Sequence, residues 1–147
     1  MDFDTRIRLH IYEQVIERQH WPLMAEIATA LHASPAEIRA ACQRLYAGRT
    51  GIVPLRDEGE LLFAAPFCAV PTPYRVAARG KEWFAPCGWD ALGIVSLLGG
   101  DGAIHTACPC CEQAIDITIT GNSLQDTYGL MNLVVPARQF WDDIVFT

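Results

Sequence analysis

The sequence has 147 residues, of which 51% are hydrophobic and 19% are charged, and its formal net charge is −6. This size and composition exclude a disordered tail and a large multidomain enzyme. The acidic balance disfavours proteins that bind nucleic acid or an anionic membrane through clustered positive charge. The sequence shows no signal peptide and no apolar run near the roughly 18 residues of a membrane span. We therefore expect a cytoplasmic protein without membrane contact.

The first part of the chain predicts three helices. Apolar residues recur at helical spacing over residues 5–18, and a second, short helix follows the break at Trp21-Pro22. Ser34-Pro35-Ala36-Glu37 is a capping box with proline at the first helical position, which predicts the start of a third helix ending at Gly48.

A β-hairpin is expected directly after the third helix. The β-like runs 52–55 and 61–65 flank the polar turn 56–59. Three helices followed by a hairpin indicate a winged-helix-like N-terminal domain, which we place at residues 1–66.

The remainder, residues 67–147, predicts a β-β-α-β core, so the fold class expected for the whole chain is α+β. A proline-rich joint leads into this core. The expected elements are strands at 74–78 and 82–85, a buried apolar helix at 91–98, strands at 103–107, 114–120 and 130–135, and a short helix at 136–140.

Cys87-Gly88-Trp89-Asp90 lies between an expected strand and the buried helix. Asp90 is placed to be the helix N-cap, and Cys87 lies just outside the same N-terminus, where amides and the helix dipole lower a thiol pKa. The neighbouring carboxylate can accept the thiol proton and pass it on. The alternative interpretation is structural: Asp90 only caps the helix, and Cys87 is a small buried hydrophobe.

A second cysteine cluster, Cys108-Pro109-Cys110-Cys111, follows His105. Its Cys-Pro-x-Cys turn is typical of a zinc knuckle, which makes Cys108 and Cys111 candidate metal ligands. A structural zinc needs four ligands, and the candidates that would complete the set are His105, Cys110, Cys68 and Cys87. The alternative is a cysteine-rich hairpin with adventitious metal affinity.

A regulator that senses metal is the alternative function. In a winged helix the third helix reads DNA, and here it carries Arg39, Gln43 and Arg44. Residues 1–60, however, hold seven basic and nine acidic side chains, a charge of −2. That charge disfavours DNA binding by a non-catalytic, soft-metal-binding winged-helix regulator.

The order of these segments resembles the organomercurial (alkylmercury) lyase family. The resemblance rests on the helical N-terminal module, the proline-bounded joint, the aromatic strand leading into Cys87-x-x-Asp90, and the Leu/Ile-rich helix. It continues through Ile104-His105-Thr106-Ala107-Cys108-Pro109 and the closing segment 136–144, and so spans nearly the whole chain.

The resemblance implies an enzyme of mercury detoxification that protonolyses carbon–mercury bonds, giving a hydrocarbon and Hg(II). It implies that Cys87 binds mercury as a thiolate and that Asp90, beside the metal, protonates the departing carbon. Thiolates are the preferred ligands of a soft ion such as Hg(II). No cofactor is required, and small thiols or a mercuric reductase would accept the Hg(II).

The family also uses a second cysteine, which in this pattern would follow shortly after residue 147, where the chain ends. The chain is then a truncated fragment, or the missing residue is a selenocysteine whose codon was read as a stop. In a third explanation, a divergent member uses Cys108, Cys110 or Cys111 as the second thiolate, or has lost activity. The ending within the apolar run 144–146 favours the first two explanations.

Overall fold

The computed structural model of the chain describes residues 1–54, 60–125, 130–133 and 135–144. Its elements are α1 (Phe3–Arg18), α2 (Met24–Leu31), α3 (Pro35–Ala47), β1 (Ile52–Pro54), β2 (Leu61–Ala64), β3 (Phe67–Cys68), β4 (Tyr74–Ala78), β5 (Lys81–Ala85), α4 (Gly88–Leu97), β6 (Gly102–Ala107), β7 (Ala114–Thr120), β8 (Ser123–Leu124) and the 3-10 helix η1 (Ala137–Gln139). The strands form one antiparallel sheet in the order β1-β2-β3-β5-β4-β6-β7-β8. The predicted α+β class is confirmed.

The three N-terminal helices form where the sequence predicts them. Ser34 accepts a hydrogen bond from the backbone N–H of Glu37 at 3.2 Å, and the Glu37 carboxylate accepts one from the N–H of Ser34 at 2.8 Å. This reciprocal capping satisfies two amides that would otherwise lack partners at the start of α3. Ile7, Ile11 and Val15 are fully buried on one face of α1. None of the described helices is long and apolar enough to cross a membrane.

The hairpin that follows continues into the sheet of the second half of the chain. β1 and β2 pair as expected, while the predicted turn 56–59 and Leu55 lie outside the described residues. β2 also pairs with β3, which the sequence does not predict and which pairs with β5 through Cys68 and Phe84. One hydrophobic core therefore contains residues from both halves, and the division into domains at residue 66 stays a prediction.

Trp83 of β5 links the sheet to α1 through a side-chain hydrogen bond. Its indole N–H donates a buried hydrogen bond to the Val15 carbonyl at 3.0 Å, and its ring lies 5.9 Å from that of Phe67, centroid to centroid.

We expect Trp83→Phe to lower the free energy of unfolding by about 1–3 kcal/mol, because a buried carbonyl loses its donor. Urea denaturation measures this. Trp89→Phe is the control, since Trp89 is 65% exposed; an equal loss in both variants would contradict the assignment.

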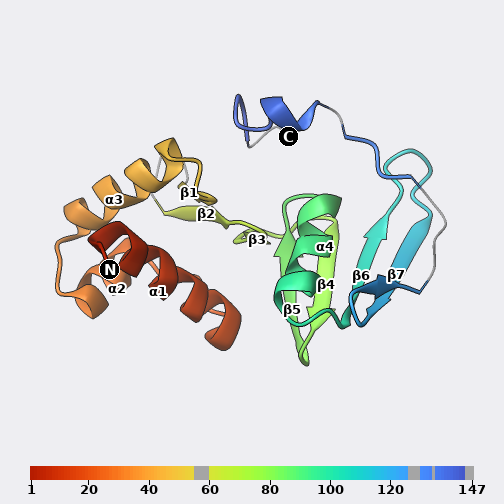
Figure 1. The fold of residues 1–147 in the computed structure, drawn as a ribbon, viewed down its shortest axis with the longest axis horizontal. Helices are drawn as coiled ribbons and strands as arrows, with labels where there is room; N and C mark the ends of the chain where they lie inside the picture. The colour runs from red at the N-terminus through yellow and green to blue at the C-terminus, as the bar shows by residue number, and fades with distance from the viewer. Residues whose placement is uncertain (55–59, 126–129, 134, 145–147) are drawn as a thin grey trace.

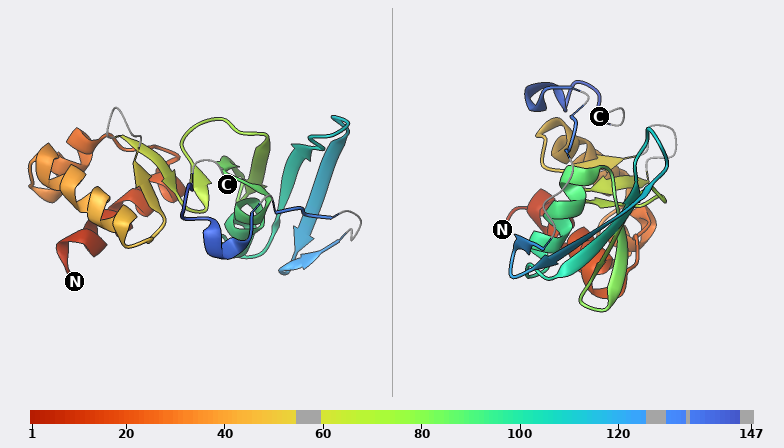
Figure 2. Two further views of the ribbon diagram at one scale, coloured as in Figure 1. Left: turned by 90° about the horizontal axis from the view of Figure 1, so that it is seen from above. Right: turned by 90° about the vertical axis from the view of Figure 1, so that its right-hand side faces the viewer.

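The second half of the chain packs α4 against the strands. Figures 1 and 2 show α1–α3 at one end of the molecule, β6 and β7 at the other, and α4 between them. Ala91, Ile94 and Val95 of α4 are fully buried. This helix therefore covers the sheet as its apolar sequence predicts.

The strand predicted at 130–135 is wrong for the described residues of that range. Residues 130–133 and 135 are not in a strand, and Leu130 is fully exposed. β8 already pairs with the edge of β7 through Leu124 and Ile119, so this apolar run finds no strand partner there. The helix expected at 136–140 is the 3-10 turn η1.

The C-terminal segment returns to the helical module. The Trp141 ring lies 6.2 Å from the ring of Tyr46, centroid to centroid, and both Trp141 and Ile144 pack on a small cluster around Phe63 and Cys68. Figure 1 shows this segment passing from the β6–β7 end of the molecule toward α3. It thereby crosses the region of the α4 N-terminus.

Candidate active site

Cys87 starts helix α4. Its backbone is extended, with φ −149° and ψ 176°, and its carbonyl accepts a hydrogen bond from the N–H of Ala91 at 3.0 Å. Cys87 is therefore the N-cap, and Asp90 lies in the first turn. The prediction that Asp90 is the N-cap was wrong, because the helix begins at Gly88, ahead of the apolar run that suggested its start.

The spacing of three residues brings the two candidate catalytic side chains together. The Cys87 thiol donates a hydrogen bond to Oδ2 of Asp90, with the sulfur and oxygen 3.2 Å apart. Both side chains are half-buried. The two side chains are therefore hydrogen-bonded to each other in a position that is only partly shielded from solvent.

Burial sets the protonation of this pair. It raises the pKa of the Cys87 thiol, although the backbone N–H groups of Asp90 and Trp89 act in the opposite direction. Burial also raises the pKa of Asp90, while the hydrogen bond from Cys87 lowers it. The amides at the helix N-terminus lower the pKa of Cys87 as predicted, but desolvation outweighs them, so the net pKa is raised and not lowered. The free site therefore contains a thiol beside a carboxyl group with an increased affinity for protons.

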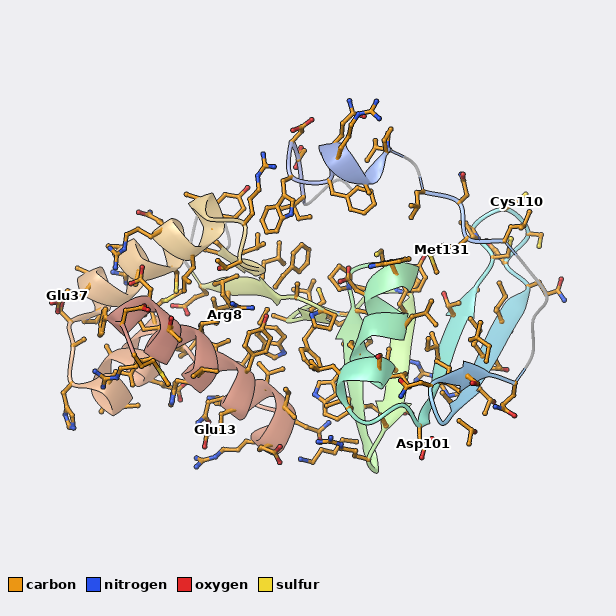
Figure 3. The ribbon with its side chains drawn as sticks, viewed as in Figure 1. Arg8, Glu13, Glu37, Asp101, Cys110 and Met131 are labelled. Atoms are coloured by element: carbon orange, nitrogen blue, oxygen red, sulfur yellow. The ribbon has the colours of Figure 1, made fainter. Side chains whose placement is uncertain are left out.

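The thioether side chain of Met131 lies beside Gly88, the residue directly after Cys87, and the sequence does not predict this contact. A Cβ placed on Gly88 would lie 3.2 Å from Cε of Met131, 3.9 Å from its Sδ, and 3.5 Å from Cε1 of Tyr74. Figure 3 shows Met131 at the N-terminal end of α4. The glycine directly after Cys87 was the available signal, because it permits such close approach.

The electrostatic influence of Asp90 extends to two further residues. Its charge raises the pKa of Cys68 and of Tyr12, after the larger effect of burial on each. The Tyr12 hydroxyl donates to the Ala65 carbonyl at 2.6 Å. The pair thus lies close to where α1 and β3 meet the start of α4. From the sequence, Cys68 was a candidate only for completing a zinc site.

The second cysteine cluster lies in the β6–β7 turn. The pKa of Cys108 is lowered because its sulfur accepts hydrogen bonds from the backbone N–H groups of Cys110 and Cys111 and from the Cys111 thiol. His105, one of the candidates for completing a zinc site, contacts Asp116, with 2.6 Å between Nδ1 and Oδ1.

The predicted metal ligands fall into two separate pairs. Cys87 lies with Asp90, and Cys108 with Cys111. Nowhere in the described ranges do three or more His, Cys, Asp or Glu side chains gather in a metal-binding group. The four ligands of a structural zinc are therefore not assembled in this part of the chain.

Comparison with known proteins places the chain in a family. The chain superimposes on a crystal structure of the mercury-bound form of MerB2 with a TM-score of 0.67 and 19% sequence identity, covering 86% of this chain and 60% of that one. This likeness shows a shared fold, and the chain spans 60% of the length of that relative. A search of curated proteins finds no match. The family model described as alkylmercury lyase matches residues 67–147, more than half of the sequence, and the chain belongs to that family.

Proposed function

We propose that this protein is an organomercurial lyase, which cleaves the carbon–mercury bond of small organomercury compounds to a hydrocarbon and Hg(II). The observation that carries the proposal is the hydrogen bond of 3.2 Å between the Cys87 thiol and the Asp90 carboxyl group. It supplies a soft ligand and a proton carrier at adjacent positions, in a member of the alkylmercury lyase family.

In the first step Cys87 captures the substrate. Its sulfur forms a bond to mercury and displaces a thiolate that the organomercurial brought with it. The thiol proton moves to Asp90, to which it is already hydrogen-bonded. Mercury supplies the driving force for this deprotonation, so the raised pKa of the free thiol does not prevent capture.

In the second step Asp90 protonates carbon. Sulfur donates electron density to mercury and increases the carbanion character of the bound carbon. Burial has raised the pKa of Asp90, so its carboxyl group holds the proton until carbon accepts it. The electron pair of the carbon–mercury bond becomes the new C–H bond. The displaced thiolate then fills the vacated position on mercury, and Asp90 ends ionised.

This chemistry requires thiol ligands and proton transfer only, so we propose that no cofactor takes part. Excess small thiols, or a mercuric reductase, would remove the Hg(II) product from Cys87 by ligand exchange. Both the substrate's thiolate partner and this removal suit a reducing compartment, which is why we propose a cytoplasmic location.

A DNA-reading regulator receives no support from the helical module. The Arg44 guanidinium makes two hydrogen bonds to the Asp4 carboxylate, from Nε at 2.8 Å and from Nη2 at 2.6 Å. One of the few basic groups on α3 is therefore already neutralised by α1. We propose that the module supports the catalytic half: the Val15 carbonyl of α1 accepts the hydrogen bond from Trp83, and the Tyr12 ring contacts the ring of Phe67.

The function is tested with phenylmercury acetate and excess monothiol. We expect the purified protein to release benzene, measured by gas chromatography, at a rate proportional to protein concentration and above that of thiol alone. Denatured protein is the control. Benzene at the thiol-only rate would refute lyase activity for this chain.

A further inference from the structure

The turn between β6 and β7 carries two thiols, Cys108 and Cys111, three residues apart. The backbone N–H of Cys108 donates to the Gln113 carbonyl at 2.9 Å, and the N–H of Glu112 donates to the Cys108 carbonyl at 2.8 Å. These two bonds close the turn. The closed turn thus keeps Cys108 and Cys111 within one short stretch of ordered backbone. The fold therefore brings the two thiols of this dithiol into the same turn before any ligand arrives.

This dithiol is accessible and chemically free. Cys111 and its neighbour Cys110 are exposed, Cys108 is partly exposed, and none of the cysteines is in a disulfide. Cys42 and Cys68, by contrast, are buried.

The number of ligands distinguishes the ions that fit. Zinc requires four, and the described part of the chain gathers no group of three or more His, Cys, Asp or Glu side chains. Hg(II) binds two thiolates in a linear arrangement, and these two ligands complete its coordination. A pair of thiols is therefore an incomplete site for zinc and a complete one for Hg(II).

We propose that Cys108 and Cys111 form a second Hg(II) site, which receives the ion after carbon–mercury cleavage at Cys87. The receiving role rests on the proposed lyase function, whereas the binding of inorganic Hg(II) by this pair does not.

The sheet places the two sites at the same edge. Tyr74 of β4 pairs with Ala85 at the end of β5, and the next residue, Arg75, pairs with His105 of β6. β5 and β6 both run antiparallel to β4, so Cys87 and Cys108 follow strands that end at this edge. Two strand spacings, about 10 Å, separate those strands. Figure 3 shows the turn that carries Cys110 and the side chain of Met131 along this edge.

Transfer between the sites is ligand exchange. Cys108 forms a sulfur–mercury bond as the bond to the monothiol or to Cys87 breaks, and Cys111 replaces the remaining ligand in the same way. Each incoming thiol gives its proton to the sulfur that leaves. The balance is one Hg(II) on Cys108 and Cys111, a protonated Cys87 and one free monothiol, with no change of oxidation state.

The test removes Cys87 and titrates inorganic Hg(II). In a Cys87→Ser background, mercuric chloride is added in competition with excess monothiol, and bound mercury is followed by charge-transfer absorbance and native mass spectrometry. We expect one Hg(II) per chain. Adding Cys111→Ser should weaken binding by about 100-fold or more, because the second thiolate then comes from solution instead of the same turn. Adding Cys110→Ser instead should leave the affinity unchanged.

Three results would overturn the proposal: no Hg(II) retained by the Cys87→Ser parent, an affinity unaffected by Cys111→Ser, or equal weakening by Cys110→Ser. Both substituted residues are exposed, and circular dichroism verifies that each variant folds. Because the titration uses inorganic Hg(II) without Cys87, its outcome does not depend on whether the protein cleaves phenylmercury.

Discussion

Cys87→Ser is expected to abolish cleavage of phenylmercury, lowering the rate of benzene release by more than about 10³-fold. Serine occupies nearly the same space and can still donate a hydrogen bond to Asp90, but its oxygen is a hard and weakly acidic ligand for mercury. The substrate would then keep its original thiolate and would not be held beside the proton carrier. Rates are measured at saturating and at limiting substrate, so that loss of binding and loss of chemistry are separated.

The control for this variant is Cys42→Ala. Cys42 is buried in α3, and burial raises its pKa to about 11, so it stays a thiol packed in the core. We expect this variant to lose some stability and to keep its rate of benzene release. Retention of activity by a correctly folded Cys87→Ser protein would remove Cys87 from the mechanism.

What the sequence predicts well in this protein is local. The start of α3 was predictable because Ser34 and Glu37 lie one helical turn apart and satisfy each other's backbone amides. The contact of Cys87 with Asp90 follows from the same spacing at the start of α4. In both cases the interacting groups are three residues apart, so no distant part of the chain decides the geometry.

The errors arise where distant segments compete. The pKa of Cys87 depends on burial by elements far from it in sequence, and this desolvation exceeds the effect of the adjacent amides. Residues 130–133 look like a strand, but pairing depends on β8, which occupies the edge of β7. The approach of Met131 to Gly88 joins positions more than 40 residues apart; the glycine permits a close approach but does not specify which distant residue makes it.

Asp90→Asn is expected to separate mercury capture from carbon protonation. An amide cannot hold and deliver the proton, so we expect benzene release to fall by about 10²–10⁴-fold. Cys87 remains able to bind mercury. Mass spectrometry of the variant after exposure to phenylmercury should therefore show a phenylmercury adduct on Cys87 that persists, whereas the unaltered protein clears it. Rapid clearance by the variant would show that another group supplies the proton.

The same substitution is expected to make the protein more stable at neutral pH. Burial raises the pKa of Asp90, so between the pKa of the unfolded chain, about 4, and the folded value the native state binds more protons. The free energy of unfolding contributed by Asp90 therefore falls as pH rises through this window. Asparagine removes the penalty of a buried carboxylate, and the gain should be largest above the folded pKa and disappear below about pH 4.

Asp4→Asn provides a control of opposite sign. The hydrogen bond from Arg44 holds the pKa of Asp4 below its ordinary value, so its contribution to stability is present above about pH 4 and is lost as pH falls through the folded pKa. At neutral pH we therefore expect Asp4→Asn to lower the melting temperature and Asp90→Asn to raise it. Thermal melts of both variants and the parent across pH 3–8 test this, and a lower melting temperature for Asp90→Asn at pH 7 would contradict it. A stabilised but inactive variant would mean that the site keeps its proton carrier at the expense of stability.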